Sequence, residues 1–430
     1  MSDHECKTCD EYRELTRRGF VGVTAGAVAF ALTPSWLPKV VYADSDDSQR
    51  DIVVSLFLRG GADGLTLCPP FGDTAYYDLR PQLAFQPPDA SGGNAALDLD
   101  GEFGLAPALE PLLEVYNGGD LLLVHATGLP DATRSHFEAM HFMEVGQGYP
   151  PPSLFSGWLG RHLQTTAPTA KDAVLRAVGI GAGLQRTLAG GPQALPIQDL
   201  DDYGFEGRGA TKAARRVAVE EMFAAVGDPE KTAAANTFRT IDLLKTIGFT
   251  SYSPAGGAAY PDGEFGYALE STAALIKAEV GVEAVAIDLG GWDTHVAQGP
   301  VEGFMAGLMG NLAGGLAAFH QDLTSDGFDN VLVVAMSEFG RNAFENGSAG
   351  TDHGHGGLMF VIGGGVKGGR VLTEWPGLEQ AQLYDGQDLA ITIDYRDILS
   401  ELLEKRLANP DATKVFTDSG YSPKTYGIAV

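Results

Sequence analysis

The chain has 430 residues, of which 44% are hydrophobic and 20% are charged, a composition typical of a folded globular protein rather than a disordered or fibrous one. Its 56 acidic and 29 basic side chains give a formal net charge of −27. This excess of negative charge repels phosphate backbones and anionic lipid, so we expect no nucleic-acid partner and no docking on an anionic membrane.

The first 43 residues are organised like an export signal. Residues 16–20 (TRRGF) form a twin-arginine pattern, an apolar stretch follows over 21–32, and residues 41–43 (VYA) give a small-x-Ala cleavage site. The apolar stretch is shorter than the roughly 20 residues that span a bilayer, and no later segment has the length and hydrophobicity of an integral membrane anchor. We predict a signal peptide over residues 1–43, export by the twin-arginine translocase, and a periplasmic or secreted mature protein.

Residues 44–430 alternate between strand-like and helix-like segments. Apolar runs rich in β-branched residues predict strands at 51–59, 120–126, 174–180, 282–289, 330–336 and 358–362. Helical spacing of apolar residues predicts helices at 136–145, 211–226, 232–247, 267–280, 301–323 and 395–407. This alternation predicts an α/β fold with a mostly parallel central sheet flanked by helices. The helical stretch at about 205–280 is a candidate insertion.

Polar side chains follow most of the predicted strands at the point where each strand ends. In open α/β sheets, ligand sites form beyond the carboxyl ends of the strands. We therefore expect these segments to meet at one rim of the sheet. They are GGADG (60–64), TRSHF (133–137), GGWDTH (290–295), SEFGRN (337–342) and, shortly before the last predicted strand, GTDHGHG (350–356).

The densest group of metal-ligand side chains is Asp352, His353 and His355 in the sequence DHGH. Carboxylate and imidazole groups bind Zn²⁺, Mn²⁺ and similar ions, and the adjacent glycines let the backbone approach a metal closely. A polar turn whose side chains are already satisfied is the alternative interpretation. Because other acidic segments are expected at the same rim, we favour a metal site.

Four further side chains have two interpretations each. Asp293 and His295 form a candidate ligand pair, although D-x-H spacing is also common by chance. Asp63, in a Gly-rich turn, is either a ligand or an Asx-turn residue. Glu338 is either a bridging carboxylate or the ion-pair partner of Arg341.

Ser135 precedes a predicted helix. As a nucleophile, it would lie at a helix N-terminus, where backbone N–H groups stabilise an anion. As a helix cap, it begins an S-x-x-E capping box that ends at Glu138. Arg134 and Arg341 are candidates for binding the phosphate or sulfate group of a substrate.

A resemblance to a known family rests on five motifs that follow the twin-arginine leader. In chain order they are LRGGADGL, RSHF, GGWDTH, SEFGRN and GTDHGHGG. The chain resembles the bacterial family called domain of unknown function 1501, which is placed with the alkaline phosphatase and sulfatase superfamily. The resemblance covers nearly all of residues 44–430 and implies one alkaline-phosphatase-like α/β domain with two adjacent metal sites. It also implies hydrolysis of a small or polymeric anionic ester with divalent metal ions, zinc first and manganese or calcium as alternatives.

The same resemblance implies roles for individual residues. Ser135 holds the nucleophile position, and Asp63 matches the carboxylate after the first strand. The other implied metal-ligand positions are Asp293, His295, Glu338, Asp352, His353 and His355.

Three departures from the superfamily pattern leave alternatives open. The first pair is spaced D-x-H rather than D-x-x-x-H, Phe339 stands where a histidine is usual, and Ser135 lacks the C/S-x-P-x-R context of sulfatases. One alternative is a non-catalytic exported metal-binding or assembly protein of the same fold. The other is a metal-free serine hydrolase, which no G-x-S-x-G elbow supports.

Overall fold

The structure is a computed structural model that describes residues 50–430, apart from residues 92, 151–153, 171–172, 201, 206, 248 and 410. The predicted signal peptide, residues 1–43, lies outside the described residues. Within the described part, no helix combines the length and the hydrophobicity needed to cross a membrane.

A nine-stranded, mostly parallel sheet forms the centre of the described part of the chain. Only β9 runs antiparallel to its neighbours β4 and β8; β11 (Ile393–Asp394) pairs with β4 outside the main order. The main order is β10 (Arg370–Leu372), β4 (Leu121–Gly128), β9 (Gly357–Ile362), β8 (Val331–Met336), β1 (Ile52–Arg59), β7 (Ala284–Gly290), β5 (Ala177–Ile180) and β6 (Ala194–Ile197). A separate small sheet pairs β2 (Leu97–Asp98) with β3 (Gly104–Leu105).

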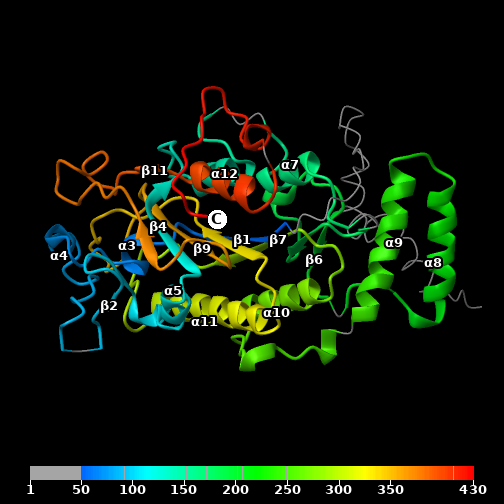
Figure 1. Ribbon diagram of the computed structural model, residues 1–430, viewed down its shortest axis with the longest axis horizontal. Helices are drawn as coiled ribbons and strands as arrows, with labels where there is room; N and C mark the ends of the chain where they lie inside the picture. The colour runs from blue at the N-terminus through cyan, green and yellow to red at the C-terminus, as the bar shows by residue number, and fades with distance from the viewer. Residues whose placement is uncertain are drawn as a thin grey trace, which may run out of the picture.

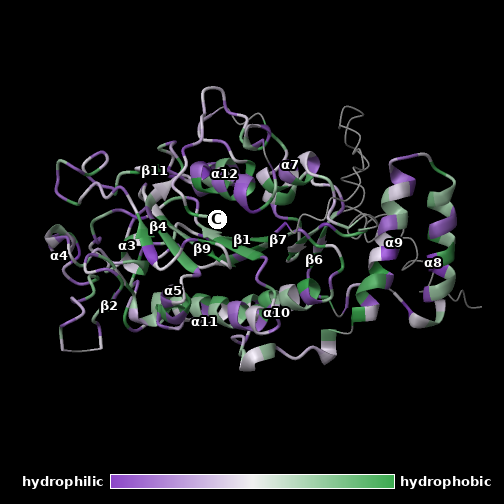
Figure 2. Ribbon diagram, in the orientation of Figure 1, coloured by the Kyte–Doolittle hydropathy of each residue, from purple (hydrophilic) through white to green (hydrophobic). Residues whose placement is uncertain are grey.

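Helices cover both faces of the large sheet (Figure 1). One layer is α5 (Pro111–Asn117), α10 (Glu264–Lys277) and α11 (Phe304–Ser325), and the other is α6 (His136–Val145), α7 (Trp158–Thr165) and α12 (Tyr395–Lys405). Successive side chains of a strand point to opposite faces, so β1 sends Val54 and Leu56 into one hydrophobic core and Val53 and Phe57 into the other. Figure 2 shows the central strands in hydrophobic colours and mixed colouring on the helices around them.

The predicted fold class is confirmed, because the sheet is mostly parallel and is flanked by helices. All six predicted strands and all six predicted helices are present, with ends shifted by a few residues. Short strands and α-helices that the sequence analysis missed are β2, β3, β6, β10, β11, α5, α7, α3 (Gly64–Leu67) and α4 (Thr74–Leu79).

The helices α8 (Gly209–Ala224) and α9 (Glu230–Ile247) form a hairpin beyond the β6 edge of the sheet, at the right of Figure 1. No residue of α8 is buried, whereas α9 buries Phe238, Ile241 and Leu244. The helix α10, which lies within the stretch predicted as an insertion, packs instead on α11 and β7.

Strand direction explains why the polar segments meet. The strands β4, β8, β1 and β7 run the same way, so their carboxyl ends lie along one edge of the sheet. Because β9 runs the opposite way, its first residue lies at that edge, and the segment before β9 reaches the same place as the segments after the other strands.

Candidate metal centre

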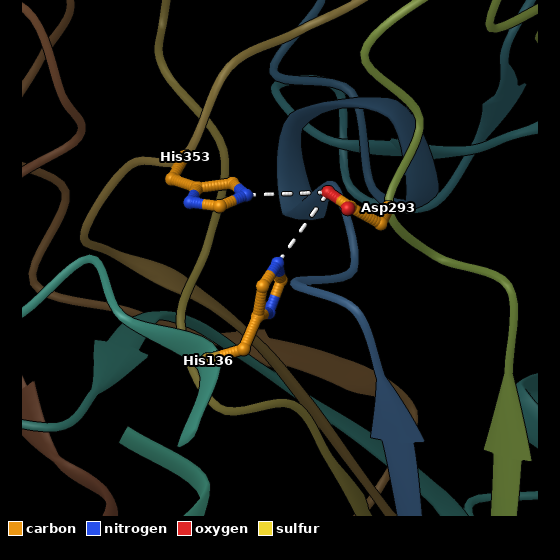
Figure 3. A group of neighbouring side chains, drawn as sticks. All are labelled: His136, Asp293 and His353. Carbon is orange, nitrogen blue, oxygen red and sulfur yellow. Dashed lines mark hydrogen bonds and ion pairs between the residues drawn. The ribbon is translucent and has the colours of Figure 1, made fainter. Parts of the chain in front are cut away.

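Three side chains from three distant segments meet at this edge. Figure 3 shows His136, Asp293 and His353 pointing toward one another, and their ligand atoms all lie within 4.8 Å of each other. His136 is the first residue of α6, Asp293 follows β7, and His353 precedes β9. Chain segments separated by at least 60 residues are thus held together by the pairing of the strands.

The carboxylate of Asp293 is the centre of this group. Its Oδ1 atom lies 3.2 Å from Nε2 of His353 and 3.5 Å from Nε2 of His136. His295 joins from the same loop, with its Nε2 atom 2.9 Å from Oδ1 of Asp293 and 3.0 Å from Nε2 of His353. Three imidazoles and one carboxylate therefore surround one small volume.

Each of the three imidazoles is bound at its other nitrogen, Nδ1, by an oxygen atom. An oxygen acceptor there keeps the proton on Nδ1 and leaves the lone pair of Nε2 free for a metal, as in histidine ligands oriented by a carboxylate or a carbonyl group. The pairs are His136 with Glu338 Oε1 (2.7 Å), His353 with the carbonyl oxygen of Arg134 (2.9 Å) and His295 with Asp352 Oδ1 (2.8 Å).

This arrangement fits a divalent cation. If Nδ1 carries the proton in both His295 and His353, their Nε2 atoms face each other at 3.0 Å as two acceptors, which repel unless a cation or an extra proton separates them. The Nε2 atom of His136 is buried and has no hydrogen-bond partner among the described residues. Imidazole nitrogen and carboxylate oxygen form a donor set that suits Zn²⁺.

Electrostatic effects lower the pKa values of Asp293, His353 and Asp352. Burial alone would raise the pKa of Asp293, but hydrogen bonding and charge from the Arg341 guanidinium at 2.7 Å lower it below its usual value. Burial lowers the pKa of His353, which keeps this imidazole neutral. The hydrogen bond from His295 lowers the pKa of Asp352, whose side chain is largely exposed. A metal ligand must be deprotonated, so these shifts favour binding of a cation.

Glu338 lies behind the centre, orienting His136. Its side chain is fully buried, and Oε1 accepts hydrogen bonds from His136 and from the backbone N–H of Gly60 (2.9 Å). Its Oε2 atom accepts from the hydroxyl of Ser337 at 2.9 Å. Arg341, the predicted alternative partner of Glu338, pairs with Asp293 instead.

Arg341 donates its hydrogen bonds to oxygen atoms of the protein itself. Its buried guanidinium donates to Asp293 and to backbone carbonyl groups in three loops around the centre. An arginine engaged in this way ties the loops together and has little capacity left for a substrate anion. The carbonyl acceptors belong to Gly60, Gly61, Trp292 and Thr351.

Asp63 belongs to a neighbouring buried network. Its Oδ2 atom accepts from Arg80 at 2.6 Å, from the hydroxyl of Thr66 at 2.6 Å and from Gln298 at 2.9 Å. Burial would raise the pKa of Asp63, but the charge of Arg80 and these hydrogen bonds lower it. The resemblance implies that Asp63 is a metal ligand. In the structure its carboxylate is paired with the Arg80 guanidinium, and it is not one of the three clustered ligands.

Ser135 and Arg134 lie directly before His136. The half-buried Ser135 is the N-cap of α6, but its side chain makes no capping hydrogen bond; the predicted capping box is therefore wrong. The hydroxyl of Thr133 instead accepts from the Ser135 N–H and donates to Glu138.

The guanidinium of Arg134 is 40% exposed, and one of its nitrogens pairs with the buried Asp388 carboxylate at 2.5 Å. The Arg134 carbonyl group also accepts from His353 Nδ1, so this residue helps to orient a candidate ligand.

His355 lies apart from the cluster in a buried position. Its ring stacks on Tyr384 with the centroids 4.3 Å apart, and burial lowers its pKa to about 4. Such a neutral, stacked imidazole supports the loop rather than reaching the three ligands.

His136 is the residue that the sequence analysis did not select. The available signal was its position directly after the loop that follows β4, at the same edge as the other candidates. The S-x-x-E pattern singles out Ser135 as a cap, and His136 then reads as an ordinary first residue of the helix. Phe339, where the superfamily resemblance led us to expect a histidine, packs its ring 4.9 Å from the rings of both His136 and His353.

Several solved structures are similar to this chain at low identity. They include Ps i-CgsB in complex with k-i-k-neocarrahexaose (8% identity, 73% of this chain and 66% of that chain, TM-score 0.32), the zinc complex of the C-terminal periplasmic domain of EcEptC from Escherichia coli (9%, 76% and 77%, 0.31) and alkaline phosphatase from the Antarctic bacterium TAB5 (10%, 75% and 94%, 0.30). TM-scores this low carry no argument about function.

No curated protein matches the chain significantly. A family model described as "Protein of unknown function (DUF1501)" matches residues 122–412. This match covers more than half of the sequence and agrees with the family predicted from its motifs. The chain belongs to the DUF1501 family of proteins of unknown function.

Proposed function

We propose that this protein is an exported, metal-dependent hydrolase of phosphate or sulfate esters. The observation that carries the proposal is the convergence of three Nε2 atoms, from His136, His295 and His353, on the carboxylate of Asp293. Zinc is the first candidate for the cation, with manganese and calcium as alternatives. Export rests on the twin-arginine leader of the sequence.

Different residues of the site would bind the cation and the ester substrate. His136, Asp293 and His353, with His295, would hold the cation, while Glu338 and Asp352 keep the imidazoles oriented. When bound, the cation supplies Lewis-acid polarisation of the ester and of the attacking group. Arg134 has a partly exposed guanidinium with which it can bind the anionic group of the substrate.

Ser135 is the proposed nucleophile because its side chain is not used as a cap and its neighbour is a candidate ligand. Its hydroxyl attacks phosphorus or sulfur, the bond from that atom to the leaving oxygen breaks, and the serine proton ends on the leaving alcohol. Water then cleaves the serine ester, which restores the hydroxyl and releases phosphate or sulfate.

Metal analysis tests this proposal most directly. We expect the protein, purified without chelator, to contain about one equivalent of a transition metal by plasma mass spectrometry. His353→Ala should lose the metal and the turnover of a phosphate- and sulfate-ester panel. His141→Ala, in the same helix as His136 but outside the cluster, is the matched control and should keep both. Absence of bound metal even after dialysis against zinc, manganese and calcium would contradict the proposal.

A cation-binding protein without turnover is the second candidate. Two observations favour it: the apolar ring of Phe339 packs against His136 where the resemblance predicts another histidine, and the carboxylate of Asp63 is bound by Arg80. Such a protein would retain zinc but hydrolyse no ester in the panel. Turnover that is present in the wild type and lost in Ser135→Ala, with zinc retained, would exclude this candidate.

A further inference from the structure

Large apolar side chains are exposed directly beside the candidate ligands. Phe137, which follows His136, is 85% exposed, and Val296, which follows His295, is 69% exposed. Phe304, at the start of α11, is 62% exposed. The end of its ring lies over Gly291, where a Cβ atom would come within 3.2 Å of it. Gly291 belongs to the same loop as Asp293, so the Phe304 ring lies against the loop that carries this candidate ligand, while Phe137 and Val296 each directly follow a candidate ligand in the chain.

A single exposed apolar side chain is ordinary on a protein surface, but three in or against the segments that carry the candidate ligands are informative. Small-molecule sites combine apolar lining with a few polar groups that fix orientation. Here the polar groups are the clustered imidazoles and Asp293, and the exposed apolar side chains belong to, or lie against, the segments that carry them. Leaving such surface exposed is unfavourable unless a ligand covers it, because burying it contributes about 25 cal/mol per Å².

We infer that the ligand of this centre has an aryl or alkyl group next to its anionic group, and that Phe137, Val296 and Phe304 receive the apolar part. This inference rests on the proposed function, since it assigns the anionic group to the metal centre and Arg134. The net charge of −27 also disfavours a polyanionic polymer, which long-range repulsion would keep away. A small amphiphilic phosphate or sulfate ester satisfies both conditions.

Binding of non-hydrolysable phosphonates to the full-length, zinc-loaded protein tests the inference without turnover. We expect 1-naphthylphosphonate to bind at least tenfold more tightly than methylphosphonate in isothermal titration calorimetry. Phe137→Ser with Phe304→Ser should remove this preference and leave methylphosphonate binding unchanged. Met222→Ser, at an exposed apolar position on the distant α8, is the matched control and should keep the preference.

The outcomes separate this inference from the proposed hydrolase. Equal affinity for the two phosphonates, or no binding of either, overturns the inference. A clear preference for the naphthyl compound, with no turnover of any ester, supports the inference and counts against hydrolysis. Sedimentation with phosphatidylcholine vesicles that is lost in Phe137→Ser would identify a lipid surface as the occupant and would also overturn it.

Discussion

At the scale of single residues, Asp63 and Asp293, the carboxylates in the loops after β1 and β7, have different partners. Asp63 is buried and bound by Arg80, Thr66 and Gln298, so its charge is already compensated inside the protein. Asp293 is half exposed and faces three imidazoles besides Arg341. A buried, compensated carboxylate serves stability, whereas an accessible one with lone pairs around it can serve a cation.

The substitutions Asp63→Asn and Asp293→Asn should therefore have opposite effects. We expect Asp63→Asn to keep the bound zinc and to lower the free energy of unfolding by about 3–5 kcal/mol, because Arg80 is left as an uncompensated buried charge. Asp293→Asn should lose zinc. Urea unfolding and metal analysis of both variants check this. Loss of zinc in Asp63→Asn would show that Asp63 is a ligand after all.

Glu338 gives a second residue-scale prediction. Removal of an outer partner of a ligating histidine weakens metal affinity by about 10–100-fold. We expect Glu338→Gln, which keeps an oxygen acceptor for His136, to weaken zinc binding by about tenfold, and Glu338→Ala by about 100-fold. Competition with a chromophoric chelator measures both constants. Zinc affinity unchanged in the alanine variant would rule out an orienting role for Glu338.

At the scale of elements, the start of α6 distinguishes a structural serine from a catalytic one. An N-cap side chain that bonds the helix contributes about 1 kcal/mol, but Ser135 makes no such bond. We expect Ser135→Ala to change the free energy of unfolding by less than about 0.5 kcal/mol while abolishing turnover.

Asp73 provides the matched control for this serine. It caps α4 by accepting from the Ala75 N–H, and it also accepts from Trp375. Asp73→Ala should lose about 1 kcal/mol or more of stability. If Ser135→Ala destabilises the protein as much as Asp73→Ala does, the serine acts as a cap in solution.

The same elements show what a sequence can predict. Strands such as β1 and β8 were predicted because strands buried on both faces are continuous apolar runs. The three-residue β10 and the two-residue β11 carry no such pattern, and only their pairing with β4 makes them strands. The rim was predictable because loops follow strand ends. The partners of Arg341 and Asp63 were not predictable from the sequence. Contacts such as the one between Arg341 and Asp293 join separate loops, so no local spacing of residues indicates them.

At the scale of the whole molecule, the fold buries ionisable groups within an acidic protein. The imidazole of His125 is fully buried in β4, where its Nε2 atom lies 3.0 Å from the Cys68 carbonyl group and Nδ1 accepts from the Ala126 N–H at 2.8 Å. These partners require the neutral tautomer with its proton on Nε2, since a proton on Nδ1 would face the Ala126 N–H. Burial lowers the pKa of His125 to about 4.

This histidine should make stability depend on pH in a defined window. Between about pH 6.5 and 4, His125 binds a proton in the unfolded chain but not in the folded one, so stability decreases as pH falls, by up to about 1.4 kcal/mol per pH unit. We expect His125→Asn, which retains an acceptor for Ala126, to be less stable at pH 7 but to lose stability less steeply below pH 6.5. Urea unfolding at several pH values measures both slopes, and comparing them cancels the titration of the many carboxylates. Identical slopes would mean that His125 is protonated in the folded protein or that β4 opens before the imidazole titrates.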